Sequence, residues 1–85
     1  MKIIFAEKAW EDYLYRQQYD KKTLKRIKEL VKAIQRDPFG GIGDPEPLRF
    51  NWSGFWSRRI DREHRLVYAV EDGALLIAQC RYHYA

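Results

Sequence analysis

The sequence contains little cysteine and lacks the patterns by which small proteins hold metals or enter membranes. Its single cysteine, Cys80, excludes an internal disulfide and fits a reducing cytoplasm. No cysteine–histidine cluster has zinc-binding spacing, and no group of carboxylates predicts a divalent-metal site. The apolar run before Glu7 is too short for a signal peptide or a membrane span. We therefore expect a soluble cytoplasmic protein that uses no metal or other cofactor.

Two common kinds of active site are also missing from the sequence. The GGIG stretch at residues 40–43 has neither the lysine nor the strand–turn–helix context of a phosphate-binding loop. Cys80 lies among apolar residues, where packing explains it better than nucleophilic catalysis does. Neither a P-loop nor a Ser–His–Asp or Cys–His site is predicted.

The composition predicts one folded domain over residues 1–85. Hydrophobic residues make up 46% of the chain and charged residues 33%, which excludes a disordered protein. The net charge of +4 is concentrated between Asp20 and Asp37, where seven basic and three acidic residues lie. The nine basic and nine acidic residues elsewhere cancel. Such a basic segment indicates either contact with a phosphate backbone or an acidic partner, or simply a solvated helix.

The first half of the chain reads as a short strand and two helices. A strand is predicted at residues 2–5, and a helix at 6–19 with its apolar face formed by Ala9, Trp10, Tyr13 and Leu14. Asp20 is a candidate N-cap for the second helix. The apolar stripe of that helix consists of Leu24, Ile27, Leu30, Val31 and Ile34. A row of lysines, here called the lysine row, lies beside it: Lys21, Lys25, Lys28 and Lys32.

The second half reads as a loop followed by consecutive strands. Residues 38–47 contain three glycines and three prolines, which predicts a loop that carries Glu46 between two prolines. Strands are predicted at residues 48–50, 54–60, 64–71 and 74–84, with a hairpin turn at Asp72-Gly73. This order of elements predicts an α+β domain in which two helices pack on one face of a twisted antiparallel sheet.

The pairing of the last two strands decides whether Arg65 and His83 share a face of the sheet. A two-residue turn pairs Arg65 with Cys80 and places Arg65 and His83 on opposite faces. A three-residue loop with a bulge, or a bend after Tyr82, brings them to one face. The sequence leaves these alternatives open.

The strand region carries a set of side chains that suits metal-free cleavage of RNA. Attack by the 2′-OH needs a base, a cation that stabilises charge on phosphorus, and an acid for the departing 5′ oxygen. The loop carboxylate Glu46, a strand arginine and His83 can fill these roles, and Tyr82 and Tyr84 can stack on a base or bind a phosphate. An ordinary turn at Glu46 and a solvated chain end at His83 are the structural alternatives. His64 is more typical of a residue that caps the turn before it.

Longer blocks of the sequence resemble a known family. These blocks are PEPL at 45–48, SGFWSRRI at 53–60, EHRLVYAV at 63–70 and CRYHY at 80–84, with AWEDYLY at 9–15 and RDPFGGIGDPEPL at 36–48. They are similar to the YoeB-type toxins of the RelE superfamily, and the similarity covers essentially the whole chain.

The resemblance implies an mRNA interferase, an endoribonuclease toxin that enters the ribosomal A site and cuts the mRNA there. It implies Glu46 as the general base, Arg65 as the phosphate stabiliser and His83 as the general acid, with Tyr84 orienting the substrate. Further RNA contacts are expected from the other cationic and aromatic residues, namely Arg58, Arg59, Arg81, Tyr82 and the lysine row.

The partners that the resemblance implies are the ribosome with its mRNA, a second copy of the chain in a homodimer, and a YefM-type antitoxin. Operator DNA would be reached only through the antitoxin complex. The chain departs from the family pattern in that Ala85 follows Tyr84, from which we expect a small effect. The alternative functions are a non-catalytic RNA- or ribosome-binding module and a ribonuclease that needs no ribosome.

Overall fold

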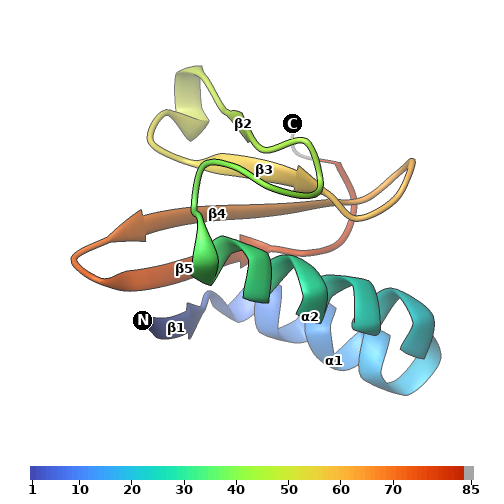
Figure 1. The fold of residues 1–85 in the computed structure, drawn as a ribbon. Helices are drawn as coiled ribbons and strands as arrows, with labels where there is room; N and C mark the ends of the chain where they lie inside the picture. Colours follow the sequence, from blue (N-terminus) through green and yellow to red (C-terminus); the bar gives the residue numbers. More distant parts are fainter. Residues whose placement is uncertain (84–85) are drawn as a thin grey trace.

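Two helices cover one face of a five-stranded sheet in the computed structural model, which describes Met1 to His83 (Figure 1). The elements in chain order are β1 (Lys2–Phe5), α1 (Glu7–Tyr19), α2 (Lys21–Arg36), β2 (Glu46–Pro47), a 3-10 turn (Phe50–Trp52), β3 (Trp56–Arg59), β4 (Arg65–Glu71) and β5 (Ala74–Gln79). The α+β class and the two-helix layer are thereby confirmed. The expectations for Tyr84 and Ala85 fall outside the described residues.

Asp20 both ends α1 and begins α2. Its N–H donates to the carbonyl of Arg16 at 2.8 Å, and its carboxylate accepts the N–H of Thr23 at 3.0 Å. The Thr23 hydroxyl donates to the same carboxylate at 2.7 Å. These two bonds from Thr23 hold the pKa of Asp20 below its ordinary value, because they stabilise the ionised form. The N-cap prediction is confirmed.

The stripe on α2 is the main apolar contribution of the helices to the core. Ile27, Leu30 and Ile34 are fully buried and Leu24 nearly so. They pack against side chains from the central strands, namely Leu66, Tyr68, Leu75 and Ile77. The prediction for this helix is correct apart from Val31, which is only partly buried.

The buried face of α1 differs from the predicted one. Ala9 is buried, but Trp10 and Leu14 are exposed, and the polar residues Asp12 and Arg16 are buried instead. Burial of polar side chains is tolerated where hydrogen bonds satisfy them. Asp12 accepts the N–H of Cys80 at 3.1 Å, and Nη1 of Arg16 donates to Asp20 at 3.3 Å. Within Met1 to His83, the buried Nε and Nη2 of Arg16 have no hydrogen-bond partner, so Arg16 is satisfied only in part. The predicted face is thus correct for Ala9 and for Tyr13, which packs against the core, and wrong for Trp10 and Leu14.

The sheet has the strand order β1-β5-β4-β3-β2. Three of its neighbouring pairs are antiparallel, but β1 runs parallel to β5. The prediction of an antiparallel sheet is therefore correct for these three pairs and wrong for β1, which makes the sheet mixed. Parallel neighbours require a long crossover connection, and the chain from α1 to β4 supplies it.

The strands are shorter than predicted. Residues 48–50 are not a strand: β2 lies earlier, at Glu46–Pro47, on the edge of the sheet where a proline is tolerated. β5 ends at Gln79 rather than at residue 84, because the chain turns at Tyr82, which has a φ of +67°. Glu46 therefore lies in a strand and not in the preceding loop.

The β4–β5 hairpin begins with a tight turn. Glu71 pairs with Ala74, and both turn residues have positive φ, +49° at Asp72 and +73° at Gly73. These angles are typical of the two-residue turns that fit the twist of a hairpin. The hairpin prediction is confirmed.

A bulge further along the hairpin then shifts the pairing by one residue. Tyr68 pairs with Ile77, whereas the preceding residue Val67 pairs with Gln79, so that Ala78 is the extra residue. The shift that the sequence left open thus occurs, but inside β5 and not in the loop. It shifts the pairing of Gln79 with β4 by one residue.

Candidate active site

The sheet face that the helices leave uncovered carries Glu46 and Arg65. Glu46 pairs with Ser57, and Arg65 pairs with Arg59 two residues further along the same strand. Paired residues, and residues two apart on a strand, point to the same side of a sheet. Glu46, Arg59 and Arg65 therefore project from one face, opposite the face that packs on α1 and α2.

The spacing of Glu46 and Arg65 suits a ligand held between them. With strands about 4.8 Å apart and an offset of two residues, their Cα atoms lie roughly 12 Å apart. Side chains of this length can reach a phosphate from opposite sides. Glu46 and Arg59 are exposed, and Arg65 is half-buried.

The guanidinium of Arg65 is held by the loop that precedes β4. Its Nη1 donates to the carbonyl of Asp61 at 2.8 Å and to the carbonyl of His64 at 3.1 Å. A guanidinium has five N–H donors, of which Nη1 carries two. The remaining three donors belong to Nε and Nη2, which make neither of these two bonds.

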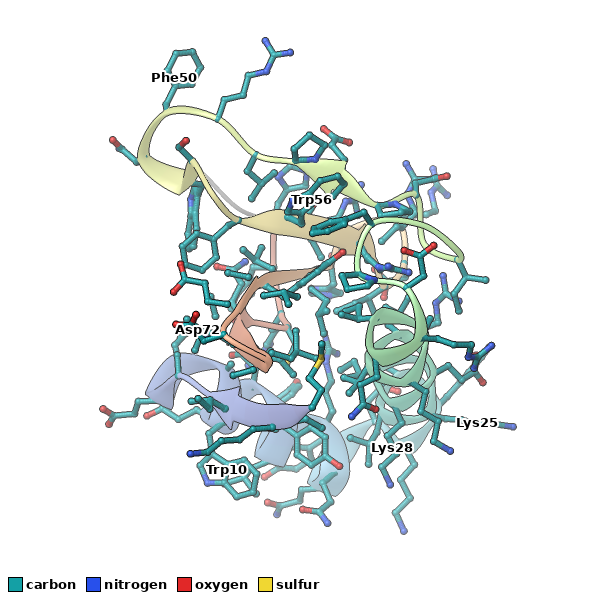
Figure 2. All side chains as sticks on the ribbon, turned by 60° about the vertical axis from the view of Figure 1, so that its left-hand side comes forward. Trp10, Lys25, Lys28, Phe50, Trp56 and Asp72 are labelled. Atoms are coloured by element: carbon teal, nitrogen blue, oxygen red, sulfur yellow. The ribbon has the colours of Figure 1, made fainter. Side chains whose placement is uncertain are left out.

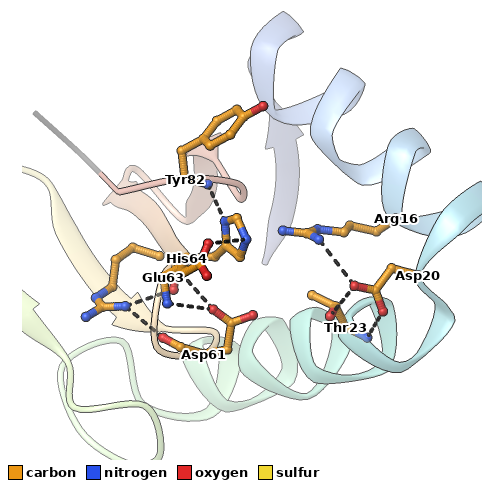
Figure 3. Close-up of polar contacts among 8 residues, drawn as sticks. Arg16, Asp20, Thr23, Asp61, Glu63, His64 and Tyr82 are labelled. Carbon is orange, nitrogen blue, oxygen red and sulfur yellow. Dashed lines mark hydrogen bonds and ion pairs between the residues drawn. The ribbon is translucent and has the colours of Figure 1, made fainter.

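The segment that leads to His83 is attached to the same loop. The carbonyl of Tyr82 accepts the N–H of Arg65 at 3.0 Å, and the N–H of Tyr82 donates to Nδ1 of His64 at 2.7 Å (Figure 3). His83, which is exposed, follows directly. The backbone that leads to His83 is therefore tied to the N–H of Arg65, the candidate phosphate-binding residue. Tyr84 lies outside the described residues.

Arg81 and Tyr82 take part in a stack of side chains. The guanidinium carbon of Arg81 lies 3.6 Å from the ring centroid of Tyr15 on α1 and 4.7 Å from that of Tyr82. The ammonium of Lys8 lies 5.2 Å from the Tyr82 ring centroid. These contacts fix the chain after β5 against α1, so packing occupies part of the surface assigned to RNA.

Arg58 is not part of an RNA-binding surface. Its side chain is fully buried and points into the core, one residue out of phase with Arg59. It donates to the hydroxyl of Tyr68 at 3.1 Å and to two loop carbonyls, of Ile42 at 2.9 Å and Asp37 at 2.7 Å. The prediction that Arg58 contacts RNA is wrong, because this side chain holds the loop after α2 to the sheet.

Close packing at Gly43 supports that role of Arg58. The loop passes so near the sheet that a Cβ on Gly43 would lie 2.8 Å from Leu30 and 3.1 Å from Arg58. Its φ of +89° also favours glycine. The loop that leads to Glu46 is therefore positioned by core contacts, and the candidate base with it.

The lysine row belongs to the helix layer. All four of its members are exposed, and Figure 2 shows Lys25 and Lys28 projecting from α2, away from the end of the molecule at which Phe50 lies. The row is thus on the other side of the sheet from Glu46 and Arg65. An RNA that contacts both would have to meet the protein from two sides.

A shallow hollow beside Glu46 was not predicted. It is lined by residues 46–52, including Arg49, Trp52 and Phe50, whose side chain is 91% exposed. A cationic residue next to an exposed ring is a visible signal in the sequence. It was missed because residues 48–50 were read as a strand.

Two buried groups near the site have shifted pKa values. Burial raises the pKa of the Cys80 thiol to about 12, and the nearby Asp12 carboxylate acts in the same direction. Burial also raises the pKa of the Tyr68 hydroxyl, against the opposing effect of Arg58. Neither group is therefore ionised near neutral pH, which fits a packing role for both.

Within Met1 to His83, no group of three or more histidine, cysteine or carboxylate side chains is placed to hold a metal ion. In the same part of the chain, neither helix combines the length and the apolar content that crossing a membrane requires.

A family model for "YoeB-like toxin of bacterial type II toxin-antitoxin system" matches residues 5–84. The chain belongs to the YoeB-like toxins. Toxin YoeB of Synechocystis sp. is 66% identical over 84 residues, which cover 99% of this chain and 98% of that relative. The resemblance noted in the sequence is thereby confirmed.

Solved structures of YoeB proteins have the same fold. The toxin in a heterotetrameric YoeB–YefM complex from Staphylococcus aureus is 53% identical, with a TM-score of 0.92 and coverage of 99% of this chain and 98% of that one. A YoeB dimer from the same organism is 53% identical, with a TM-score of 0.93 and the same coverage. This YoeB-like toxin thus resembles proteins solved both with an antitoxin and as a dimer.

Proposed function

We propose that this YoeB-like toxin is an endoribonuclease of the cytoplasm that cleaves mRNA in the ribosomal A site and so inhibits translation. The observation that carries the proposal is the shared open face of Glu46 and Arg65 beside the segment that leads to His83. Base, cation and acid are the three groups that cleavage by a 2′-OH requires.

In this mechanism Glu46 takes the proton of the 2′-OH, and the 2′ oxygen attacks phosphorus. The O2′–P bond forms and the P–O5′ bond breaks, which leaves a cyclic phosphate and a 5′-OH. Arg65 stabilises the negative charge that builds up on the phosphate oxygens. His83 gives its proton to the departing 5′ oxygen, and Tyr84 orients the substrate.

The proposal assigns RNA binding to two surfaces. Arg59 pairs with Arg65 across the sheet, so that two positive charges lie side by side on the open face. Arg81 and Tyr82 would meet the RNA at the edge of that face, where their stack leaves Tyr82 51% exposed. The lysine row would bind ribosomal RNA on the opposite side.

The proposed partners of this toxin are a YefM-type antitoxin and a second copy of the chain. Complexes and dimers of this composition exist for YoeB of Staphylococcus aureus. An antitoxin would inhibit the enzyme by disturbing the residues around His83. Operator DNA would be contacted only through the antitoxin complex.

Primer extension on an mRNA, with and without translating ribosomes, tests the proposal. A new 5′ end only in the presence of ribosomes is the expected result. Cuts in both reactions would indicate a ribonuclease that needs no ribosome. Absence of cuts in both, from folded protein, would favour the binding module.

The His83→Gln variant separates catalysis from binding. We expect it to lose cleavage while it still co-sediments with ribosomes, because binding rests on many cationic contacts. Cleavage at the wild-type rate would show that His83 is not the acid.

A further inference from the structure

The turn at Tyr82 determines where His83 lies, and it has an unusual backbone. The φ of Tyr82 is +67°, in the left-handed region that residues with large side chains rarely adopt. Such a conformation persists only where the surrounding structure holds it. The contacts of Tyr82 therefore control the direction in which the chain continues.

Two consecutive residues hold the backbone of Tyr82 on both sides. Nδ1 of His64 accepts its N–H at 2.7 Å, and the N–H of Arg65 donates to its carbonyl at 3.0 Å. The imidazole of His64 is itself largely buried, with 16% of its side chain exposed. Figure 3 shows this ring between the Tyr82 backbone and the Arg16 guanidinium.

His64 is in turn fixed by the loop before β4. Its N–H donates to the Asp61 carboxylate at 2.8 Å, and the N–H of Glu63 donates to the same oxygen at 2.9 Å. Burial raises the pKa of Asp61, but these two bonds outweigh it and leave that pKa below its ordinary value. An ionised Asp61 thus orders the loop that carries both His64 and Arg65.

We propose that His64 is a positioning residue for cleavage: with Nδ1 unprotonated, it holds the turn at Tyr82 and thereby aims His83 at the phosphate bound by Arg65. This inference rests on the proposed function and adds a residue to which no step of the mechanism assigns a role. One loop would then position both the phosphate-binding cation and the acid.

The contact works only while His64 is neutral. Protonation of Nδ1 turns the acceptor into a donor, which repels the Tyr82 N–H. The charged groups around the ring come from three elements. Glu63 and Asp61 lie in the loop before β4, and Oε2 of Glu63 is 3.9 Å from Nε2 of His64. Arg16 lies on α1, and Asp20 lies between the two helices.

Two substitutions at His64 separate the role of Nδ1 from the presence of a polar side chain. In His64→Asn the amide oxygen lies near the position of Nδ1 and can accept the Tyr82 N–H. In His64→Gln the amide reaches the position of Nε2 instead and leaves Tyr82 without its acceptor. The two variants are thus a matched pair in charge and polarity.

The experiment measures hydrogen exchange of the Tyr82 amide by NMR, together with ribosome-dependent cleavage. We expect slow exchange in wild type and in His64→Asn, and exchange at least about tenfold faster in His64→Gln. Cleavage by His64→Gln should fall about 10²-fold, as for a misplaced catalytic group, while His64→Asn keeps most of it.

Three outcomes would overturn the proposal for His64. They are unchanged Tyr82 exchange in His64→Gln, full cleavage by that variant, and equal loss of cleavage in both variants despite equal thermal stability. Failure of the proposed function looks different: wild type would bind ribosomes and cut nothing, although the Tyr82 amide would still exchange faster in His64→Gln.

Discussion

At the scale of single residues, the two neighbouring arginines on β3 lie in different environments, one in the core and one in solvent. Arg58 is fully buried and Arg59 is exposed, because successive residues of a strand point to opposite faces. A buried guanidinium must be satisfied by hydrogen bonds, and the Tyr68 hydroxyl and loop carbonyls do so for Arg58. Variants at the buried network should therefore affect stability, and variants on the open face should affect activity.

The Tyr68→Phe variant tests the buried network. The hydroxyl accepts from Arg58 and donates to the carbonyl of Pro38 at 2.6 Å, so its loss leaves two buried groups without this partner. We expect the free energy of unfolding in urea to fall by about 1–3 kcal/mol. Tyr19→Phe, at a ring that is 67% exposed, is the control and should change little. Equal stability of the two variants would contradict the role of the network.

The Arg65→Ala variant tests the open face. Loss of one group that stabilises charge in the transition state should cost about 2.7–4 kcal/mol, a fall of about 10²–10³-fold in cleavage. The midpoint of thermal unfolding should remain close to that of wild type. A parallel loss of folding would instead make Arg65 structural, through its bonds to the loop carbonyls of Asp61 and His64.

At the scale of elements, the sequence predicts both helices, but it predicts the buried face of α2 well and that of α1 only in part. The buried positions of α2 follow its apolar stripe, so the helical period alone identifies them. In α1 the buried side includes Asp12 and Arg16, and the partner of Asp12, the N–H of Cys80, comes from the far end of the chain and meets it only in the folded protein. The helical spacing of apolar residues therefore predicts the helix α1 but not its whole buried face.

In the sheet and the candidate site, too, the sequence does not predict features that depend on contacts formed only in the folded protein. Alternation and turn residues predict the β4–β5 hairpin, but no residue signals the bulge at Ala78, which depends on how the end of β5 meets β4 and α1. Glu46, Arg65 and His83 were selected from chemistry and family resemblance. Arg58 could not be told from Arg59, because that requires the register of β3.

The lysine row of α2 gives a prediction about salt. If these side chains bind ribosomal RNA, the logarithm of the binding constant for ribosomes should fall linearly with the logarithm of the salt concentration. Replacing both Lys25 and Lys28 by alanine should reduce that slope by about 1 for each lysine removed. Co-sedimentation with ribosomes at several salt concentrations measures the slope. An unchanged slope would remove the row from the interface.

The cap between the helices gives a prediction about pH. The folded-state pKa of Asp20 lies below its unfolded value, so its stabilising effect is present above the unfolded pKa and is lost as the pH falls through the folded pKa. Asp20→Asn keeps an N-cap that does not titrate. We expect the stability difference between wild type and Asp20→Asn to shrink below about pH 4 in thermal unfolding. A constant difference would contradict this linkage.

At the scale of the whole molecule, Cys80 reports on the packing of the two layers. It is fully buried, its Sγ lies 3.5 Å from the carbonyl oxygen of Ala9 on α1, and its pKa is raised to about 12. Only the thiolate reacts with alkylating reagents. The thiol can therefore react only when the helix layer separates from the sheet.

We expect iodoacetamide at about pH 8 to label the native protein far more slowly than the urea-unfolded protein, since the ordinary cysteine pKa is about 8.5. Mass spectrometry over time measures the rate, and the lone cysteine makes the signal unambiguous. Addition of an antitoxin that binds the folded state should slow it further. Rapid labelling of the native protein would show that the two layers open frequently.

The strand order has a consequence for the moment at which this toxin becomes able to act. β5 lies between β1 and β4, so the first and the later strands of the sheet are joined only by the last one to be synthesised. While the chain is still being translated, β1 has no neighbour and the core lacks Leu75, Ile77 and Cys80. The sheet can therefore become complete only after β5 has been synthesised. A chain built in this order lacks its complete core, and the turn that leads to His83, until β5 has joined β1 and β4.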